Sequence, residues 1–218
     1  MFDALIKVGG SLYHHPELLA ITAVWARLAT AHRLLLLPGG GPFADQVRAA
    51  DTRFHLSDSA AHWMAILAMD QYAYLLADLT PQAALVRDLA AAATICAARR
   101  PAILAPSSHL LQQDPLPHSW QITSDSIAAW LAQEVGIHLL VLLKSVTGVY
   151  QPDPQSHSTG LLRQVSRQTL AHHDSVDCYF AQTLSPSTDC WIIDGRQPER
   201  LAELLQFGCT VGTHVMEV

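Results

Sequence analysis

Two strand–turn–helix units follow one another at the start of this chain. The first is an apolar strand over 4–8, followed by a glycine turn at 9–11 and an amphipathic helix. The second is an apolar strand over 33–37, then the turn at 38–41 and a helix that begins at Pro42. Units of this kind in succession build a parallel sheet covered by helices. We therefore predict an α/β protein.

The rest of the chain continues the alternation of helices and strands. A long helix over 59–78 is expected after Ser57, and Ser124 is expected to cap a later helix over 125–135. Further strands are predicted at 84–86, 102–104, 138–144, 190–193 and 210–214, with further helices near 88–98, 176–183 and 198–205. The Pro-, Ser- and His-rich stretch 106–120 is expected to be a binding loop, and 151–159 a mobile flap.

Composition narrows the class of protein. The 218 residues are 50% apolar and 15% charged, which suits one compact folding unit. A net charge of -6 without a basic stripe argues against nucleic acid or an anionic membrane as a partner. The longest apolar runs are too short to cross a bilayer, and no signal peptide is recognisable, so we expect a cytoplasmic protein with reduced cysteines.

Lysine is used at only two positions, whereas arginine is used at eleven. Lys7 and Lys144 both lie in otherwise apolar strands, where a buried charge is costly. Their retention indicates that a compact ammonium group is needed at these two places, although chance within an arginine-rich composition is the plain alternative.

The two glycine turns are candidate phosphate-binding loops. They match neither the Walker pattern nor a dinucleotide fingerprint, so ordinary tight turns between strand and helix are the alternative. Glycines in such turns let backbone N–H groups approach an anion at a helix N-terminus. Lys7 ends its strand two residues before Gly9, which places its ammonium where those phosphates would sit.

Asp125 lies at a helix start, where a carboxylate can simply cap the helix. The functional alternative is a counter-charge that holds Lys7 in place and keeps it protonated. The twelve histidines show no zinc-ligand spacing, so no metal ligand is assigned to a side chain.

Four segments, in this order, resemble the amino acid kinase superfamily: IKVGGSL at 6–12, PGGGPFADQVR at 38–48, ITSDSIAAWLA at 122–132 and LLKSVTGVYQPDP at 142–154. The resemblance covers nearly the whole chain. It implies a three-layer αβα sandwich around a mainly parallel sheet, in a single domain that assembles as a homo-oligomer. The acceptor would bind to the half at about 1–135, and ATP with Mg²⁺ to the half at about 136–218.

The resemblance also implies roles for single residues. Lys7 would neutralise the transferring phosphoryl group, and Asp125 would organise the charged cluster. The amide cradle would come from Gly9, Gly10, Gly40 and Gly41, and the nucleotide contacts from Lys144, Gly148, Tyr150 and Asp153. Many members carry a further lysine after the nucleotide region, which this chain lacks. Lys144, Arg163 or Arg167 must replace it, or catalysis is weakened.

Segments at 57–72, 120–126, 194–201 and 210–213 are most similar to one branch of that superfamily. Its members phosphorylate (5-(aminomethyl)furan-3-yl)methyl phosphate to the diphosphate during methanofuran assembly. Arg48 would then bind the acceptor phosphate, with His62, Trp63, Asp114 and Trp120 shaping the pocket, although His62 and Trp63 could instead pack in the core. A uridylate or isopentenyl phosphate kinase is the alternative enzyme. A non-catalytic nucleotide- or oxyanion-binding protein is the alternative of another class.

Overall fold

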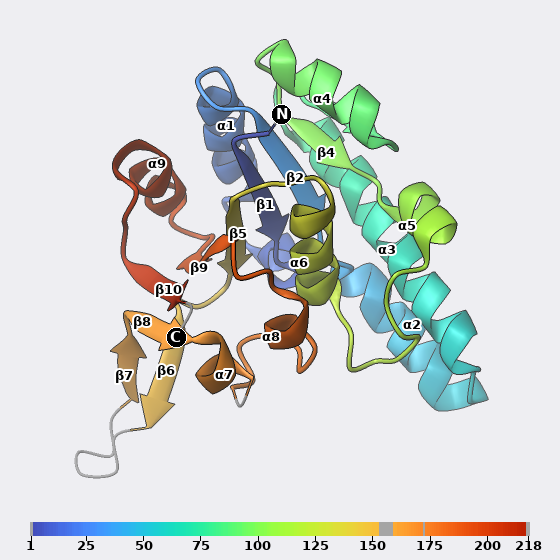
Figure 1. Ribbon diagram of the computed structural model, residues 1–218. Coiled ribbons are helices and arrows are strands. Elements are labelled where there is room, and N and C mark those ends of the chain that lie inside the picture. The colour runs from blue at the N-terminus through green and yellow to red at the C-terminus, as the bar shows by residue number, and fades with distance from the viewer. Residues whose placement is uncertain (1, 153–158, 172, 217–218) are drawn as a thin grey trace.

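The computed structural model describes residues 2–152, 159–171 and 173–216, and its centre is one eight-stranded sheet (Figure 1). The strands pair in the order β3-β4-β2-β1-β5-β9-β10-β8. They are β1 (Ala4–Val8), β2 (Leu34–Pro38), β3 (Ala84–Val86), β4 (Ala102–Leu104), β5 (Leu139–Lys144), β8 (Gln164–Ser166), β9 (Asp189–Asp194) and β10 (Gly212–Met216). Neighbours are parallel except for β9 and β10, which confirms the predicted mainly parallel α/β sheet.

Helices cover both faces of the sheet. They are α1 (Leu18–Ala29), α2 (Gly41–Phe54), α3 (Asp58–Leu79), α4 (Leu89–Ala97), α5 (Ser107–Gln113), α6 (Ser124–Glu134), α7 (Arg167–Leu170), α8 (Phe180–Thr183) and α9 (Pro198–Phe207), with a short 3₁₀ turn at Gly10–His14. Helices α1 and α9 pack on one face and α4, α6 and α8 on the other, while α3 contributes to both cores. None of the helices described is long and apolar enough to cross a membrane.

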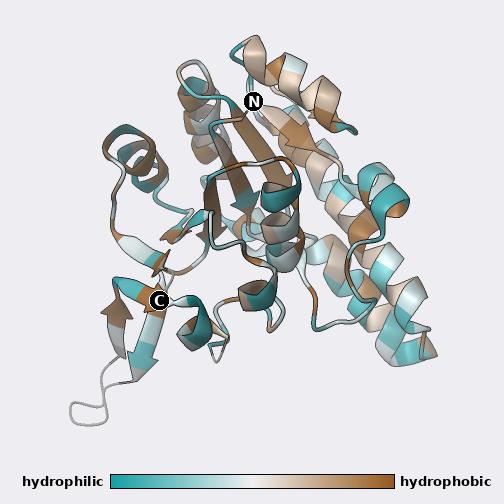
Figure 2. Ribbon diagram, in the orientation of Figure 1, coloured by the Kyte–Doolittle hydropathy of each residue, from teal (hydrophilic) through white to brown (hydrophobic). Residues whose placement is uncertain are grey.

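The central strands are almost wholly apolar, as the brown ribbons of Figure 2 show. All five residues of β1 and of β2 are buried, as expected for parallel strands covered on both faces. Side chains of a strand alternate between its two faces. In β1, Leu5 therefore points toward α6 and Ile6 toward α1, and Lys7 shares the α6 face with Leu5.

Strand β5 continues the same pattern next to β1. Leu5 pairs with Leu140 and Lys7 with Leu142, so the even-numbered residues of β5 also face α6. Lys144, at the end of β5, therefore lies on the same face and at the same sheet edge as Lys7. The pairing of β1 with β5 makes the sheet continuous between the N-terminal and C-terminal halves of the chain.

The loop predicted over 106–120 is partly helical, so that prediction is wrong. Its first half forms α5, because Asp70 of α3 accepts a hydrogen bond from the Ser107 amide at 3.1 Å and another from the Ser107 hydroxyl. Leu110 of the same helix is buried against the core. Only the stretch after Asp114 remains without regular structure before α6 begins.

The C-terminal third contains elements that the sequence did not predict. Strands β6 (Val149–Pro152) and β7 (Thr159–Leu162) form an antiparallel hairpin beside the main sheet. Strand β8 pairs with β10 and is an edge strand of the main sheet. The predicted flap at 151–159 lies largely outside the described residues. The helix predicted over 176–183 is only the single turn α8.

Candidate active site

Two lysines share one buried carboxylate at the carboxyl end of the central strands. The Nζ of Lys7 lies 2.9 Å from Oδ1 of Asp125, and the Nζ of Lys144 lies 2.5 Å from Oδ2. Side-chain exposure is only 5% for Lys7 and Asp125 and 17% for Lys144. With both ammonium groups charged, the cluster carries one net positive charge in a desolvated site, which suits it to bind a phosphoryl group.

Burial and charge act against each other on these groups. Burial lowers the pKa of Lys7, while the nearby carboxylate of Asp125 opposes that shift. Burial alone would raise the pKa of Asp125, but Lys7 and Lys144 outweigh it and leave this pKa below its ordinary value. Asp125 is therefore ionised at neutral pH, and its charge favours the protonated form of Lys7.

Helix α6 places Asp125 beside the two lysines, and the residue that caps its N-terminus is not the predicted one. Thr123, not the predicted Ser124, is the N-cap, and its Oγ1 accepts a hydrogen bond from the Asp125 amide at 3.3 Å. The Asp125 carboxylate is thus left to the lysines and does not serve as a plain helix cap. Ser124 is instead the first residue of the helix.

Asp177, from the C-terminal half, holds the start of α6 in place. Its carboxylate accepts hydrogen bonds from the Thr123 amide at 2.9 Å, the Thr123 hydroxyl at 2.7 Å and the Ser126 amide at 3.1 Å. The Ser126 hydroxyl also donates to it. A carboxylate at a helix N-terminus is favoured by the exposed amides and by the helix dipole. Sequence reasoning missed Asp177, because no local pattern connects it with a helix some fifty residues earlier.

The two glycine turns touch each other beside this cluster. A Cβ on Gly10 would lie 2.6 Å from the amide nitrogen and the Cα of Gly41, so only glycine permits this approach. The amide of Gly9 donates to the carbonyl of Leu143 at 2.8 Å. Because that N–H is already bonded, the amide donors of the predicted cradle reduce to Gly10, Gly40 and Gly41.

A cavity of about 460 Å³ opens next to the glycine turns. Of the residues predicted to form the acceptor pocket, Arg48, His62 and Trp120 line it, as do Gly10, Gly40 and Gly41. The lining also includes polar side chains that the sequence analysis did not assign to the acceptor pocket: Ser11, His14, Asp45, Thr123 and Ser124. Asp45 has a local signal, since it precedes Arg48 by one helical turn and pairs with it at 3.0 Å.

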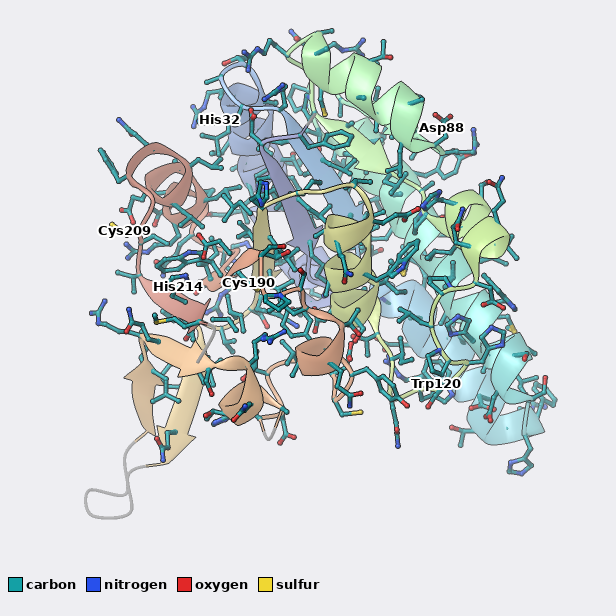
Figure 3. The ribbon with its side chains drawn as sticks, in the orientation of Figure 1. His32, Asp88, Trp120, Cys190, Cys209 and His214 are labelled. Carbon is teal, nitrogen blue, oxygen red and sulfur yellow. The ribbon has the colours of Figure 1, made fainter. Side chains whose placement is uncertain are left out.

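Trp120 is fixed at the wall of this cavity, on the stretch between α5 and α6 (Figure 3). Its Nε1 donates to Oδ2 of Asp51 at 2.7 Å, and the guanidinium of Arg48 lies 4.9 Å from its ring. Trp63 and Asp114 do not line the cavity. Trp63 packs against the hydrophobic core, as the alternative interpretation held, and Asp114 pairs with His118.

A second cavity, of about 360 Å³, lies on the Lys144 side of the cluster. Asp125 and Lys144 line it together with the stretch from Asp174 to Cys178. Thr123 and Trp120 line both cavities, so the two lie next to each other at the start of α6. Two adjoining cavities therefore lie at the start of α6, and the charged cluster lines the second of them.

The remaining predicted nucleotide contacts lie elsewhere. Gly148 packs against Thr213, whose Oγ1 accepts from the Val149 amide at 2.8 Å, and Tyr150 is exposed on β6. Neither Gly148 nor Tyr150 lines the two cavities, and Asp153 lies outside the described residues.

Three residues were candidates to replace the lysine that this chain lacks after its nucleotide region. Arg167 donates to the carbonyl of Leu184 at 2.6 Å. Arg163 lines a third cavity, together with Trp191 and His214. Of the three, Lys144 is the residue that contacts Asp125.

Comparison with known proteins agrees with this architecture. The amino acid kinase family model matches residues 4–181. The [5-(aminomethyl)furan-3-yl]methyl phosphate kinase of Methanocaldococcus jannaschii is 28% identical over 98% of each chain. The structure of uridylate kinase from Archaeoglobus fulgidus has a TM-score of 0.77 at 21% identity, covering 98% of this chain and 99% of that one. For isopentenyl phosphate kinase from T. acidophilum the TM-score is 0.62 at 18% identity, covering 97% and 99%. This chain therefore belongs to the amino acid kinase family and is a phosphotransferase.

Proposed function

We propose that this enzyme transfers the γ-phosphoryl group of ATP to the phosphate of (5-(aminomethyl)furan-3-yl)methyl phosphate, giving the diphosphate and ADP. The observation that carries the proposal is the cavity beside the Lys7–Asp125–Lys144 cluster, which is lined by one cationic and one anionic side chain, Arg48 and Asp45. The Methanocaldococcus jannaschii relative, which matches along 98% of this chain, supports the same acceptor.

Phosphoryl transfer requires position and charge neutralisation more than proton chemistry. An oxygen of the acceptor phosphate attacks the γ-phosphorus in line, and the bond from that phosphorus to the bridging oxygen of ADP breaks. The nucleophile is already ionised, so no general base is needed. ATP would arrive as its Mg²⁺ complex, which would supply charge neutralisation at the phosphates. Lys7 and Lys144 stabilise the charge that moves from the attacking to the leaving oxygen, and Asp125 holds both ammonium groups in place.

The cavity suits a small zwitterionic acceptor. Its volume of about 460 Å³ lies within the usual range of ligand pockets, roughly 300–1,000 Å³. In our proposal the acceptor phosphate lies at the glycine end, near Gly10 and Ser124. The furan ring packs against the apolar wall formed by Ile66, Met69 and Ile127. The ammonium group then pairs with Asp45, a contact that UMP and isopentenyl phosphate cannot make because they lack an ammonium group.

The ATP phosphates are proposed to occupy the second cavity, where Lys144 lies. Asp174 and Asp177 also line it, so a triphosphate there needs its Mg²⁺ to offset the repulsion from carboxylates. Contacts of Gly148 and Tyr150 with the adenosine moiety stay a prediction of the sequence analysis.

ADP release from Mg·ATP, measured separately with the furan phosphate, UMP and isopentenyl phosphate, tests the proposal. We expect turnover with the furan phosphate. Asp45→Asn should lower kcat/KM for it at least about 10-fold, the usual size of one lost charged contact. The matched control is Asp58→Asn, which neutralises an exposed carboxylate of α3 outside the cavity.

Two other results of this assay would contradict parts of the proposal. Preference for UMP or isopentenyl phosphate would keep the kinase reaction and replace the acceptor. Silence with all three acceptors, despite measurable ATP binding, would favour the binding-protein alternative.

A further inference from the structure

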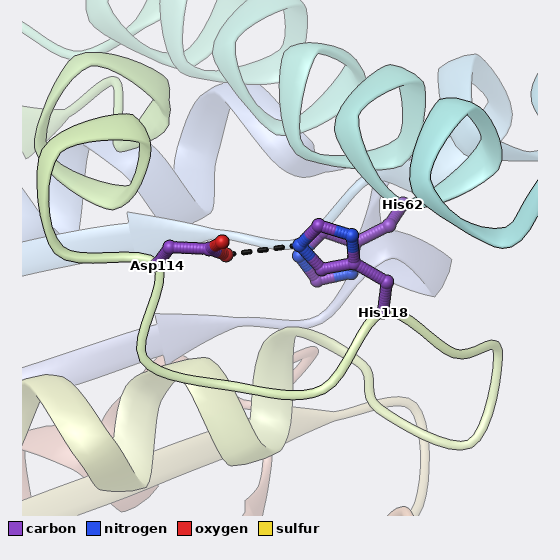
Figure 4. Close-up of side chains that lie close together, drawn as sticks. All are labelled: His62, Asp114 and His118. Atoms are coloured by element: carbon purple, nitrogen blue, oxygen red, sulfur yellow. Dashed lines mark hydrogen bonds and ion pairs between the residues drawn. The ribbon is translucent and has the colours of Figure 1, made fainter.

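Three side chains with metal-binding atoms lie close together, as Figure 4 shows, and one of them, His62, also lines the first cavity. His62 comes from α3, Asp114 ends α5, and His118 lies on the stretch that leads to α6. One ligand atom from each residue lies within 4.8 Å of the other two. The fold thus brings the metal-binding atom of His62 next to those of Asp114 and His118, which follow some fifty residues later in the sequence. No sequence motif reveals a set of ligands spaced in this way.

The contacts around His118 are those of an oriented metal ligand. Its Nε2 lies 2.9 Å from Oδ1 of Asp114, and its Nδ1 lies 2.7 Å from the hydroxyl of Ser59. A histidine that binds a metal through one ring nitrogen typically donates its other N–H to an oxygen, which fixes the ring. The hydroxyl of Ser59 can accept a hydrogen bond from the Nδ1–H of His118. The Nε2 atom of His118 then faces the carboxylate of Asp114 and could bind a cation together with it.

His62 stacks on His118, with ring centroids 4.3 Å apart and an angle of 18° between the rings. Trp63 meets both imidazoles edge-on, at 5.2 Å and 5.4 Å. Asp114, the C-cap of α5, has a left-handed backbone with φ of +39°, a conformation in which aspartate and asparagine occur more often than most residues.

The distances allow a tetrahedral ion after small movements. Zinc binds imidazole nitrogen and carboxylate oxygen at about 2.0–2.2 Å, so two ligand atoms on one tetrahedral ion lie roughly 3.3–3.5 Å apart. The hydrogen bond of 2.9 Å between His118 and Asp114 would open by about half an ångström. The widest spacing, at most 4.8 Å, would close by up to about 1.5 Å, which a rotation of the His62 ring out of its stack on His118 can supply.

We propose that His62, Asp114 and His118 form a binding site for one transition-metal dication of the zinc class, with a fourth position open to water. Two nitrogens and one carboxylate oxygen favour such an ion over Mg²⁺, which prefers oxygen ligands alone. The bound metal ties the stretch that carries Trp120 to α3, and it lies next to the acceptor because His62 also lines that cavity. The site goes beyond the proposed function, since no step of phosphoryl transfer requires it.

The test is Zn²⁺ uptake by the full-length protein after removal of metals with a chelator, measured by competition with a chromophoric chelator. We expect one tight equivalent per chain. His118→Ala and His62→Gln should each weaken binding at least about 100-fold, because loss of even an outer-shell partner costs about 10- to 100-fold. Co²⁺ in place of zinc should give the intense visible absorption of a tetrahedral ion. Circular dichroism of the metal-free variants checks that they fold.

His109→Ala is the matched control. His109 also pairs with a carboxylate, Glu134 at 2.8 Å, and its ring also packs against a tryptophan, tilted by 33° to Trp130, but no second imidazole among the described residues contacts it. Its loss should leave zinc affinity unchanged. Equal zinc uptake by the wild type and by the His62→Gln/His118→Ala double variant would overturn the proposal. Metal uptake is read on the free protein, so this result stands apart from whether the furan phosphate is the acceptor.

Discussion

Asp125→Asn is the substitution that most directly tests the charged cluster. Asparagine keeps the size of the side chain and removes its charge. The ammonium groups of Lys7 and Lys144 then face each other in a site where their side chains are only 5% and 17% exposed. The amide can still accept one hydrogen bond from an ammonium group, but it cannot offset two positive charges.

The size of the effect follows from this burial. Removing one partner of a buried ion pair costs about 3–5 kcal/mol when the remaining charge stays in place. The cheaper response is loss of a proton from Lys7, whose pKa burial already lowers. Phosphoryl transfer then proceeds with one cation fewer. We expect kcat to fall at least about 100-fold, which corresponds to about 2.7 kcal/mol of transition-state stabilisation.

The assay is ADP release at saturating substrates from about pH 6 to pH 9, a range that avoids titration of the ordinary carboxylates. Lys7 acts in its charged form. In the variant its pKa lies lower still, so the residual kcat should fall as pH rises through that pKa and recover toward acid pH. Asp88→Asn is the control. Asp88 caps α4 through the Ala91 amide at 2.7 Å, a role that asparagine fills equally well. An Asp125→Asn enzyme with wild-type kcat would refute our account of the cluster.

Three further outcomes are expected. Gly10→Ala should lower kcat/KM at least about 10-fold, because its Cβ would force the two turns apart, whereas Gly160→Ala, with open space around it, should not. Asp194→Asn should lower the free energy of unfolding at neutral pH by about 1 kcal/mol in urea titrations. Hydrogen bonds from Arg196 outweigh burial and hold the pKa of Asp194 below its ordinary value. The stability that its charge adds is therefore present above about pH 4 and lost as pH falls through the lowered value, so the variant should show a weaker loss in acid. Light scattering should detect a homo-oligomer, since α3 leaves Leu67 and Tyr74 exposed, and a monomer at all concentrations would contradict this.

Local sequence patterns were sufficient to predict those elements whose structure depends on residues close by in the sequence. The two glycine turns and the strands at 84–86 and 102–104 fall where the sequence placed them, because apolar runs bounded by glycine, proline or polar residues have few alternatives. The expected contact between Lys7 and Asp125 is also present. This contact could be predicted because the end of β1, which carries Lys7, and the start of α6, which carries Asp125, lie at the same edge of the sheet.

Features that depend on distant partners could not be read in this way. Helix α5 begins where Asp70, from α3, accepts two hydrogen bonds from Ser107. No residue close to α5 in the sequence predicts this interaction. The same holds for Asp177 at the start of α6 and for His118 beside His62. Each joins segments that lie far apart in the sequence and meet only through tertiary packing.

The contact of both lysines with one carboxylate depends on strand register. Lys7 belongs to the N-terminal half and Lys144 to the C-terminal half, and both reach Asp125 only because β1 and β5 pair with Lys7 opposite Leu142. A slip of β5 by one residue would turn Lys144 to the opposite face, toward α1 and α9. Asp177 secures the same geometry from the other side, because it holds the start of the helix that carries Asp125. The positive centre is therefore a product of the joined sheet, and neither half contains it alone.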